Sequence, residues 1–432
     1  MGKYQGYDKY KDSGVEWLGE IPDHWEVKRL KYVCVINPSK SCISNFSKNT
    51  EVSFVPMEYV DNNGNINLEE TKKIEEVWQG YTYFEDRDVI IAKITPCFEN
   101  GKGALCKNLY NKIGFGSTEF HVLRAFPKKL LPELIYYLTQ STTFSSLGTA
   151  ELYGVAGQKR VPESFLSNYL LGFPPLDEQE KIARFLDYKT KQIDELIAKK
   201  ETLIEKLDEK RTALITHAVT KGLDVNVPMK DSGIEWLGEI PQHWDVKNLR
   251  YICEFLNKRR IPLSSEERGS MSDKIYSYYG ASGIIDYVEN FIFDEPTILI
   301  AEDGANLLSR STPLAFIAEG KYWVNNHAHI LKPFSGNFKY WANLLCIIEY
   351  DYWITGSAQP KLTKDNLGSI KLADPPLHEQ QKIAEYLDQK TAEIEEQKAK
   401  IQQAIDLLKE YRTALITNAV TGKIDVRQID IP

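Results

Sequence analysis

The chain lacks the sequence signatures of membrane, secreted and disulfide-rich proteins. None of its apolar runs approaches the roughly 18 residues of a membrane span, and the opening residues, MGKYQGYDKYKDSG, have no apolar core of signal-peptide length. Its six cysteines include no CxxC pair. We therefore expect a cytoplasmic protein without membrane contact, in which the thiols are reduced and mostly buried.

Motifs for nucleotide chemistry and catalysis are also missing. The sequence has no GxxxxGK[ST] phosphate loop and no GxGxxG at the start of a helix. Residues 374–377, DPPL, resemble the Asp/Asn-Pro-Pro-aromatic motif of amino-methyltransferases, but the equivalent residues 173–176 read FPPL, and neither copy ends in an aromatic residue. His327 and His329 lack further metal ligands, which favours a hydrogen-bonding or packing role. We predict no catalytic residue, no metal site and no cofactor bound to this chain.

Charge does not indicate a partner. The net charge is −8 at pH 7, but Lys and Arg nearly balance Asp and Glu in each part of the chain. A local basic patch, or a partner protein, could still supply contacts to phosphates. Composition therefore neither supports nor excludes binding to DNA.

The most informative feature that is present is a duplication. Residues 11–34 recur as residues 230–253 with 18 of 24 positions identical, and residues 174–225 recur as residues 375–426 with 30 of 52 identical. We call these two repeated blocks the frame. The inserts between them, residues 35–173 and 254–374, do not recur and differ in length by 18 residues. A frame repeated around unlike inserts favours a protein that presents two different readers to one two-fold object.

The second block of the frame predicts a long helix. Both copies begin with Pro-Pro-Leu and continue for about 40 residues without Pro or Gly. Apolar residues recur at alternating steps of four and three, the period of a coiled coil. A helix of this length extends to about 60 Å, beyond the roughly 30 Å that one domain covers, so we expect the two copies to pair antiparallel. The alternative is a single amphipathic helix that lies on its own domain. The predicted coiled-coil and partner-docking residues are Ile182, Leu186, Ile193, Leu203, Leu207, Leu214, Ile383, Leu387, Ile394, Ile401, Leu408 and Leu415.

The inserts combine strand and helix patterns. Strands are predicted at residues 52–60, 88–95 and 118–126 with a helix at 132–144, and again at residues 297–303, 313–318 and 328–332 with a helix at 338–354. The expected fold class is mixed α/β, with two globular α/β domains joined by two long antiparallel helices in a pseudo-two-fold circular arrangement. The expected domains are residues 1–173, the helix region 174–225, residues 226–374, and the second helix region with a tail, 375–432.

Polar clusters in the inserts are candidates for contacts with nucleic acid. Amide, hydroxyl and cationic side chains read base edges or bind phosphates, although the same residues are ordinary in solvated turns. The candidates are Asn62 and Asn63 (with Asn65 in the same loop), Thr95, Asn100, Lys102, Gln158, Lys159, Arg160, Lys258, Arg259, Arg260, Gln359 and Lys361.

The whole chain resembles the specificity subunits of type I restriction-modification systems. The resemblance rests on the two SGxEWLGEIPxHWxVxxL blocks, on the two PPLxEQxKIAxxLD…RTALIT blocks, and on phrases inside the inserts. Those phrases are FVPMEYV, ITPCFENGKGAL, GFGSTEFHVLR, YYGASGIIDYV, ILIAEDGANL and WVNNHAHIL.

This resemblance implies a function and a set of partners. Each insert would be a target recognition domain that reads one half of a bipartite double-stranded DNA site, and the paired helices would set the gap. Such subunits are not catalytic. They recruit two adenine-N6 methyltransferase subunits, which use S-adenosylmethionine, and two ATP-dependent motor and nuclease subunits, with ATP and Mg on the partners.

Other functions remain open at this point. One is an orphan or phase-variable specificity subunit that serves methylation only. A second is a structural coiled-coil adaptor that does not recognise a DNA sequence. A self-contained methyltransferase or nuclease is disfavoured because its motifs are missing.

Overall fold

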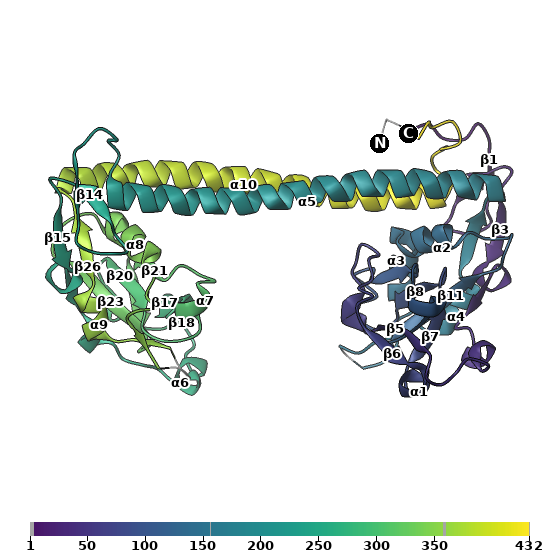
Figure 1. Ribbon diagram of the computed structural model, residues 1–432, viewed down its shortest axis with the longest axis horizontal. Coiled ribbons are helices and arrows are strands. Elements are labelled where there is room, and N and C mark those ends of the chain that lie inside the picture. Colours follow the sequence, from purple (N-terminus) through teal and green to yellow (C-terminus); the bar gives the residue numbers. More distant parts are fainter. Residues whose placement is uncertain (1–3, 156, 357–359, 432) are drawn as a thin grey trace. The chain divides into compact units, whose positions relative to one another are not determined.

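The computed structural model describes residues 4–155, 157–356 and 360–431. The chain divides into two compact units (Figure 1): unit 1 comprises residues 1–200 and 402–432, and unit 2 comprises residues 201–401. Each unit contains one insert, one copy of the first frame block, and part of each long helix. Those helices are α5 (Leu176–Lys221) and α10 (Leu377–Val420). Among the described residues, no helix has both the length and the apolar character that crossing a membrane requires.

The remaining elements of unit 1 are mostly short strands. In chain order they are β1 (Tyr10–Asp12), β2 (Glu20–Pro22), β3 (Glu26–Arg29), η1 (Leu30–Tyr32), β4 (Cys34–Ile36), η2 (Lys40–Ile43), β5 (Glu51–Val55), η3 (Met57–Tyr59), β6 (Thr71–Lys73), α1 (Ile74–Val77), β7 (Thr82–Glu85), β8 (Val89–Ala92), β9 (Gly103–Leu105), η4 (Tyr110–Lys112), β10 (Ile113–Gly116), β11 (Phe120–Ala125), α2 (Pro132–Thr139), α3 (Thr142–Ala150), α4 (Glu163–Asn168) and β12 (Leu170–Phe173).

Unit 2 has a similar succession of elements. They are β13 (Met229–Asp231), β14 (Glu239–Pro241), β15 (Asp245–Asn248), η5 (Leu249–Tyr251), β16 (Cys253–Phe255), η6 (Asn257–Arg259), α6 (Ser265–Gly269), β17 (Tyr276–Gly280), β18 (Gly283–Val288), β19 (Phe293–Asp294), β20 (Thr297–Ala301), α7 (Asn306–Ser309), β21 (Ala315–Ala318), β22 (Lys321–Val324), β23 (Ala328–Pro333), α8 (Phe338–Ile347), β24 (Ile354–Thr355), β25 (Lys361–Leu362), α9 (Lys364–Ser369) and β26 (Lys371–Asp374).

The two inserts share one sheet topology although their sequences do not align. One sheet has the order β4-β11-β8-β9 in unit 1 and β16-β23-β20-β21 in unit 2, and both are antiparallel. The other has the order β6-β5-β10-β7 in unit 1 and β18-β17-β22-β19 in unit 2. Its central pair, β5 with β10 or β17 with β22, is parallel in both units. The predicted mixed α/β class is confirmed, and the inserts differ in surface and length rather than in fold.

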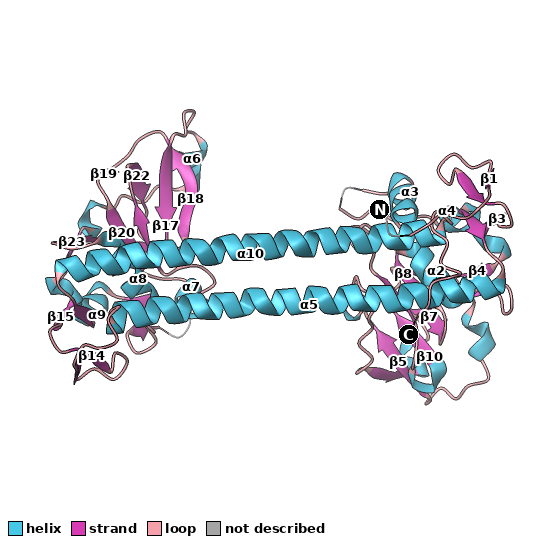
Figure 2. Ribbon diagram, turned by 90° about the horizontal axis from the view of Figure 1, so that it is seen from above, coloured by secondary structure: helices cyan, strands magenta, loops and turns pink. Residues whose placement is uncertain are grey.

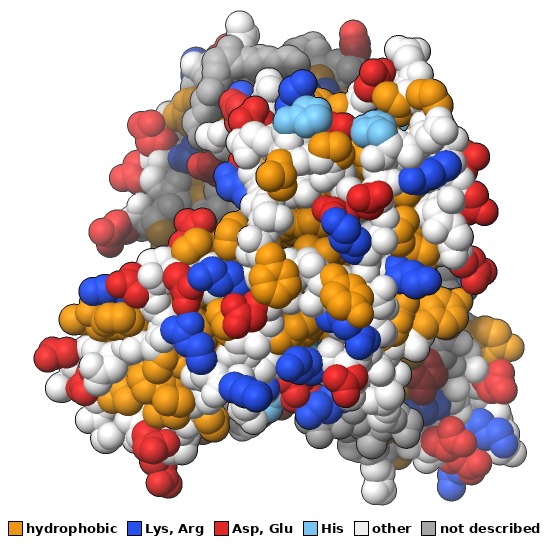
Figure 3. Space-filling model, turned by 90° about the vertical axis from the view of Figure 1, so that its left-hand side faces the viewer, with side chains coloured by type: hydrophobic (Ala, Val, Ile, Leu, Met, Phe, Trp, Pro, Cys, Tyr) orange, Lys and Arg blue, Asp and Glu red, His pale blue; other side chains and the backbone are white. Residues whose placement is uncertain are grey.

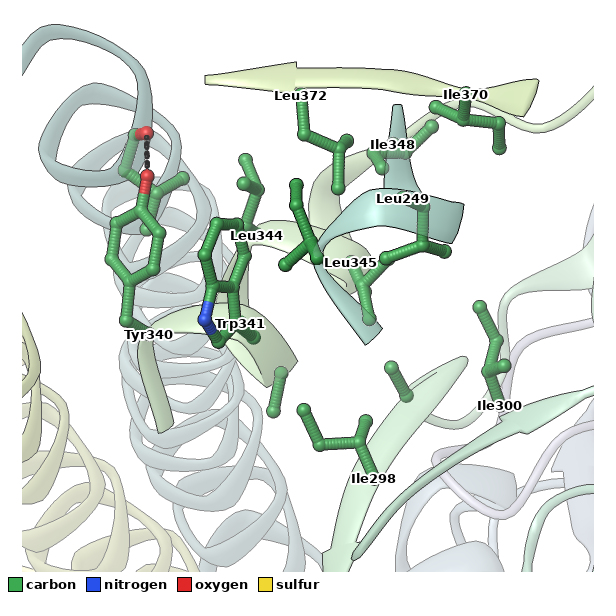
Figure 4. Close-up of a cluster of buried hydrophobic side chains, with 14 of the residues drawn as sticks. Leu249, Ile298, Ile300, Tyr340, Trp341, Leu344, Leu345, Ile348, Ile370 and Leu372 are labelled. Atoms are coloured by element: carbon green, nitrogen blue, oxygen red, sulfur yellow. Dashed lines mark hydrogen bonds between the residues drawn. The ribbon is translucent and has the colours of Figure 1, made fainter. Parts of the chain in front are cut away.

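Helix α8 anchors the insert of unit 2 to the frame. Its apolar side chains Trp341, Leu344 and Leu345 are buried against strands β20 and β26, as Figure 4 shows. One turn before Leu344, the hydroxyl of Tyr340 donates a hydrogen bond to the carbonyl oxygen of Val219 in α5, at 3.1 Å. The insert and the end of the long helix therefore share one core. Burying each large side chain of this kind contributes roughly 1.5–3 kcal/mol to folding.

The helices α5 and α10 run antiparallel within each unit (Figure 2), as predicted. In unit 1, Arg412 pairs with Asp194 at 2.9 Å. In unit 2, Lys398 pairs with Asp208 at 2.5 Å, and Arg211 lies 3.6 Å from Glu395. The two residue numbers add up to the same total in all three pairs. A single antiparallel register therefore describes the pairing in both units.

The buried seam of these helices differs in phase from the predicted one. Leu203 is 46% exposed, so its assignment to the seam was wrong. The predicted steps lead from Leu186 to Lys189, three residues further on, but the buried residue is Thr190, four residues further on. From this point the steps of four and three alternate in the opposite order. Every second predicted position in both helices is consequently off by one residue. Of the predicted seam residues, Ile182, Leu186, Ile193, Leu207, Ile383, Leu387, Ile394 and Leu415 are buried, and Leu214, Ile401 and Leu408 are partly buried.

The Glu-Gln pair after each Pro-Pro-Leu explains why that motif is repeated. Glu178 accepts hydrogen bonds from the indole of Trp25 and the hydroxyl of Tyr7, at 3.0 and 2.5 Å, and lies 2.7 Å from His24. Glu379 makes the equivalent contacts with Trp244 and His243, at 2.9 and 2.6 Å. These buried or half-buried carboxylates tie the first frame block to the second in both units.

The adjacent glutamines connect the frame to the inserts. The side-chain oxygen of Gln179 accepts a hydrogen bond from the backbone N–H of Leu131, at 2.9 Å, immediately before α2. Gln380 accepts one from the backbone N–H of Asn337, at 3.1 Å, immediately before α8. Both glutamines are fully buried, and each fixes the start of a helix that belongs to the variable insert.

The Lys-Gly pair at the end of the first long helix is reversed to Gly-Lys at the end of the second, but both lysines make the same contacts. The alignment places Lys221 opposite Gly422, and Gly222 opposite Lys423. The Lys221 ammonium donates to the carbonyl oxygens of Leu237 and Glu239. The Lys423 ammonium donates to the carbonyl oxygens of Leu18 and Glu20, which are the same two positions of the other frame copy. The side chain of each lysine therefore reaches the same place from neighbouring backbone positions.

Two predicted helices end earlier than expected. The segment 132–144 forms two helices, because Ser141 caps the second one by accepting a hydrogen bond from the N–H of Phe144. The segment 338–354 is helical only to residue 347, and Ile348 is extended. In both places a polar or β-branched residue ended a helix that the apolar pattern alone would have continued.

The described cysteines are free thiols. Cys34, Cys106 and Cys253 are buried, Cys97 and Cys346 are half-buried, and Cys42 is exposed. Burial raises the pKa of the equivalent Cys34 and Cys253 thiols to about 12. These two side chains are therefore packing residues of the frame.

Candidate nucleic-acid interface

A buried His side chain, bonded to an Asn side chain at the surface, organises the candidate site in unit 1. Asn37, just after β4, accepts a hydrogen bond at Oδ1 from the backbone N–H of Val122, at 3.0 Å. Its Nδ2 lies 3.2 Å from Nδ1 of His121, and Nε2 of that histidine lies 2.9 Å from the carbonyl oxygen of Val161. Because a carbonyl only accepts, Nε2 carries the proton and Nδ1 accepts from Asn37. His121 is thus a neutral connector between the sheet and the segment that leads to α4.

Unit 2 contains the same arrangement. Asn257 accepts at Oδ1 from the backbone N–H of Ile330, at 3.0 Å, and its Nδ2 lies 2.7 Å from Nδ1 of His329. Nε2 of His329 lies 2.7 Å from the carbonyl oxygen of Leu362. The expectation that His329 has a hydrogen-bonding role is confirmed. Within the described residues, no group of three or more His, Cys, Asp or Glu side chains could hold a metal ion.

Both histidines are held in the neutral form. Burial lowers the pKa of His121 and of His329 below the ordinary value of that group, although the hydrogen bond to a backbone carbonyl acts in the opposite direction. A neutral imidazole can donate from one nitrogen and accept at the other, which is what each position requires. We call Asn37 with His121, and Asn257 with His329, the Asn–His pairs.

Each Asn–His pair brings together two loops that are distant in sequence. In unit 1, Thr95 and Lys159 exchange two hydrogen bonds, from Lys159 N to Thr95 Oγ1 at 3.1 Å and from Thr95 N to Lys159 O at 2.9 Å. The backbone N–H of Val161 donates to the carbonyl of Lys93 at 2.8 Å. The candidates Thr95 and Lys159, which belong to separate clusters in the sequence, therefore lie side by side.

The corresponding loops of unit 2 meet in the same way. The backbone N–H of Leu362 donates to the carbonyl of Glu302 at 2.8 Å, and that of Gly304 donates to the carbonyl of Pro360 at 3.2 Å. Glu302 thus occupies the backbone position that Lys93 occupies in unit 1. The candidate Lys361 lies in this junction, and the candidate Gln359 lies outside the described residues.

Several candidate cations already have internal partners. Arg160 forms a two-point ion pair with Glu119, at 2.9 and 2.8 Å, and this hydrogen bonding lowers the pKa of the Glu119 carboxyl. Arg259 pairs with Glu295 at 2.5 Å, and its guanidinium lies 4.3 Å from the centre of the Phe293 ring. A phosphate contact by either arginine would therefore compete with an existing carboxylate.

Glu302 holds two more of the candidates. Its carboxylate lies 2.5 Å from Arg260 Nη1 and 3.3 Å from Lys361 Nζ. Burial alone would raise the pKa of Glu302, but Arg260 and Lys361 keep it below its usual range. The Arg260 and Glu302 side chains are only 16% and 12% exposed. Arg260 has a structural role here, and Lys361, at the rim, keeps half of its side chain exposed.

The remaining candidates of unit 1 lie in turns. Asp61 accepts hydrogen bonds at Oδ1 from the backbone N–H groups of Asn63 and Asn65, at 2.8 Å each, so this loop is an Asx turn. The Lys102 ammonium donates to the carbonyl of Met57 at 3.1 Å.

Other candidate side chains are available to a ligand. Within the described residues, no hydrogen bond or ion pair engages the side chains of Asn62, Asn63, Asn100, Gln158, Lys159 and Lys258, all of which are exposed. Their contacts with DNA stay a prediction.

Sequence reasoning singled out His329 but missed the other three residues of the Asn–His pairs, Asn37, His121 and Asn257. Asn37 and Asn257 precede no recognisable motif, and the two histidines fall in inserts that do not align. The available signal was a His two or three residues into a hydrophobic strand in each insert, in TEFHVLR and in HAHILK. His121 and His329 also lie 40 and 33 positions before the carbonyls that they bond.

Surface charge agrees with the balanced composition. Figure 3 shows one face of the molecule, on the side of β14 and β15, where Lys and Arg alternate with Asp and Glu among exposed hydrophobic side chains. No broad area of one sign is visible on this face.

Comparison with known protein families gives a consistent result. The family described as "Type I restriction modification DNA specificity domain" matches the chain twice, at residues 22–206 and 241–405. The EcoAI specificity subunit of Escherichia coli, a type I restriction enzyme subunit, is 42% identical over 164 residues, 38% of this chain. The match spans 27% of the length of that relative.

Two further comparisons cover nearly the whole chain. The MjaIX specificity subunit of Methanocaldococcus jannaschii is 23% identical over an alignment of 466 positions, which covers 99% of each chain. A chain from a solved structure concerned with complex assembly and conformational transition of the type I R-M system superposes with a TM-score of 0.73 at 18% identity, over 93% of this chain and 98% of that one. At this identity the likeness concerns the fold.

Proposed function

Because the chain belongs to the type I restriction-modification DNA specificity family, we propose that each insert reads one half of an asymmetric, bipartite DNA sequence. The observation that carries this proposal is the repeated frame around two unlike inserts of one topology. Two different readers on one scaffold fit a target whose halves differ. A symmetric target would need only one kind of insert.

The long helices act in this proposal as the element that sets the gap between the half-sites. Each is continuous and contributes to both units, since α5 is divided between them at residue 200 and α10 at residue 401. Polar residues at buried positions, such as Arg412 paired with Asp194, allow only one register of the two helices. In this proposal, a fixed register of the helices corresponds to a fixed gap between the half-sites.

The subunit has no catalytic role in this proposal. It recruits two adenine-N6 methyltransferase subunits and two motor and nuclease subunits, which bring S-adenosylmethionine, ATP and Mg. The twofold repetition of the frame supports two copies of one partner, since some exposed residues are identical at equivalent positions of the two copies. Tyr32 and Tyr251, at equivalent positions, are 59% and 71% exposed, which is unusual for tyrosine and typical of interface residues.

A matched deletion tests the gap-setting role. Removing residues 200–206 from α5 and 400–406 from α10 keeps the register of all three interhelical ion pairs. Seven residues correspond to about 10 Å of helix, or about three base pairs at 3.4 Å each. Methylome sequencing should show a gap shorter by about three base pairs between unchanged half-sequences. Altered half-sequences would contradict the proposal.

Exchange of an insert tests the independence of the readers. Replacing residues 35–173 with the insert of a relative should alter one half-site and leave the other as it was. A change in both halves would count against two separate readers. The same experiment addresses the adaptor alternative, because a purely structural adaptor would yield no sequence-dependent DNA binding when methyltransferase is supplied.

A subunit that serves methylation alone would need the same fold and the same DNA-reading inserts in this chain. It differs in the partners that are bound. Co-purification with a motor and nuclease subunit would favour restriction, and methylation without any restriction of unmodified DNA would favour the alternative.

A further inference from the structure

An open pocket of about 350 Å³ lies beside the Asn–His pair of unit 1. Its polar lining includes Ser39, Lys40, Thr82 and Lys93, and Tyr81 forms part of its wall. Lys93 follows β8 and leads directly to Thr95 in the candidate loop. The pocket is therefore continuous with the loops that the sequence indicated as a contact region for nucleic acid.

The two lysines of this pocket have no carboxylate partner within the described part of the chain. Lys40 donates to the carbonyl oxygen of Trp78, and its ammonium lies 5.3 Å from the centre of the Trp78 ring. The Lys93 side chain forms no hydrogen bond or ion pair with any described residue. Of the acidic residues nearby, Glu119 is held by Arg160 at 2.8 Å, although the Lys93 charge also helps to lower the pKa of its carboxyl, and Glu163 accepts from Asn37 at 2.7 Å.

Unit 2 provides an internal comparison. Glu302 occupies the backbone position of Lys93, and Arg260 stands three residues after Asn257, as Lys40 stands three residues after Asn37. Where unit 1 has two cations, unit 2 has an ion pair of 2.5 Å between Arg260 and Glu302. The position of Lys93 thus carries in unit 2 a carboxylate that is paired with Arg260, whereas unit 1 has a cation at both of these positions.

We propose that the pocket of unit 1 binds a single phosphate group of the DNA backbone between Lys40 and Lys93, and that unit 2 has no equivalent phosphate site. This inference rests on the proposed function, since it assigns one contact within the DNA-reading surface of unit 1. Two ammonium groups and the hydroxyl of Thr82 offer the donors that a phosphate oxygen accepts. The half-site read by unit 1 then gains affinity that depends more strongly on salt.

Salt dependence of DNA binding tests the site. The full chain, together with methyltransferase subunits, is titrated with a duplex that carries the target found by methylome sequencing and with a scrambled duplex, at several chloride concentrations. The logarithm of the association constant falls with the logarithm of salt by about 0.9 per phosphate contacted. The Lys40→Ala, Lys93→Ala double variant should therefore show a slope smaller by about one than the wild type.

Two further variants separate loss of the site from loss of the fold. Lys93→Glu copies unit 2, where Glu302 pairs with Arg260, so this variant should keep the fold. It should reduce the salt slope by about as much as the Lys40→Ala, Lys93→Ala double variant does. Lys107→Ala removes an exposed cation of unit 1 that does not line the pocket and should leave the slope unchanged. Slopes for Lys93→Glu and the double variant equal to that of Lys107→Ala would overturn the phosphate site.

The source of the phosphate is distinguished by competition. Inorganic phosphate, added at constant ionic strength, should weaken DNA binding by the wild type and not by Lys93→Glu if the pocket also takes the free ion. If DNA binding by the wild type is insensitive to free phosphate while the slopes still differ, the site is specific for the backbone, and the proposal stands. Failure of the wild type to prefer the target duplex would overturn the proposed function itself, whereas preference with unchanged slopes overturns only the phosphate site.

Discussion

Arg412 of α10 donates to both carboxylate oxygens of Asp194 in α5, at 2.9 and 3.3 Å. The two residues are 218 positions apart in the chain. Arg412 is only 9% exposed and lies where an apolar residue of a coiled coil would be expected. Asp194 supplies the carboxylate that this buried guanidinium needs within the helix pair, and Tyr136 of α2 also interacts with Arg412. The pair with Asp194 therefore favours one register of the helices.

Removing the arginine should destabilise unit 1. The variant Arg412→Met leaves Asp194 without its partner inside the helix pair, and a lost hydrogen bond to a charged group costs about 1.5–3 kcal/mol. Lys398→Met is the matched control, because its partner Asp208 is half exposed and such pairs contribute roughly 0–1 kcal/mol. Urea denaturation of both variants measures the difference. Equal losses would show that the Arg412 pair does not fix the register more than an ordinary surface ion pair.

The connection between frame and insert should depend on Gln179. Its side chain bonds the backbone N–H of Leu131 and the carbonyls of Lys129 and Pro174, at 2.9 to 3.0 Å. Gln179→Ala leaves these buried groups unsatisfied, and we expect a loss of roughly 2–4 kcal/mol from the free energy of unfolding. Glu180→Ala changes the exposed neighbour and should stay within about 0.5 kcal/mol. A Gln179→Ala variant as stable as Glu180→Ala would mean that apolar packing alone holds α2.

The Asn–His pairs make stability depend on pH below neutrality. Because burial lowers the pKa of His121 and His329, the unfolded chain binds protons below about pH 6.5 while the folded chain does not. The free energy of unfolding should therefore fall as the pH decreases from about 6.5 towards the folded pKa. The steepest slope is about 1.4 kcal/mol per pH unit for each histidine.

Substitution identifies the contribution of each unit. His329→Asn lowers stability at neutral pH and should remove the part of the pH dependence that belongs to unit 2. His327→Asn is the control, since that ring is 48% exposed and its side chain bonds Asp303 at the surface. Hydrogen exchange followed by mass spectrometry resolves the two units at each pH. An unchanged pH profile in His329→Asn would contradict the assignment of a neutral, buried histidine.

The two interchanged lysines should be equivalent in their effects. Lys423→Met removes the contacts to Leu18 and Glu20 in unit 1, and Lys221→Met removes those to Leu237 and Glu239 in unit 2. Each should lower protection against hydrogen exchange in the frame strand of its own unit, by an amount corresponding to about 1–3 kcal/mol. A loss confined to one of the two variants would show that the lysines are not equivalent.

The frame could be predicted from the sequence because it is present twice. Agreement between residues 174–225 and 375–426 defines the two long helices, and their polar composition is unlike that of membrane helices. The phase of the seam could not be obtained in this way, since Lys189 and Thr190 are both polar and the choice between them depends on the facing helix.

The candidate site was less predictable, for a different physical reason. Arg160 and Arg260 are candidates because cations attract phosphates, but a cation that has a carboxylate within 3 Å is occupied. Those carboxylates, Glu119 and Glu302, lie 41 and 42 residues away in the chain. Pairing over such distances depends on sheet topology, which the unlike inserts did not reveal.

Gln179 and Gln380 bond mainly to the backbone of the inserts; the one side-chain contact that they make there is from Gln380 Nε2 to Asp374 Oδ1, at 3.3 Å. A peptide N–H is offered by nearly every residue, and here it comes from Leu131 in one insert and from Asn337 in the other. The lysines at the ends of the helices likewise address only carbonyl oxygens. These two attachment points therefore place little demand on which side chains the insert carries there. Under the proposed function, such attachment through the backbone would help a host lineage to acquire new DNA specificities by exchange of whole inserts.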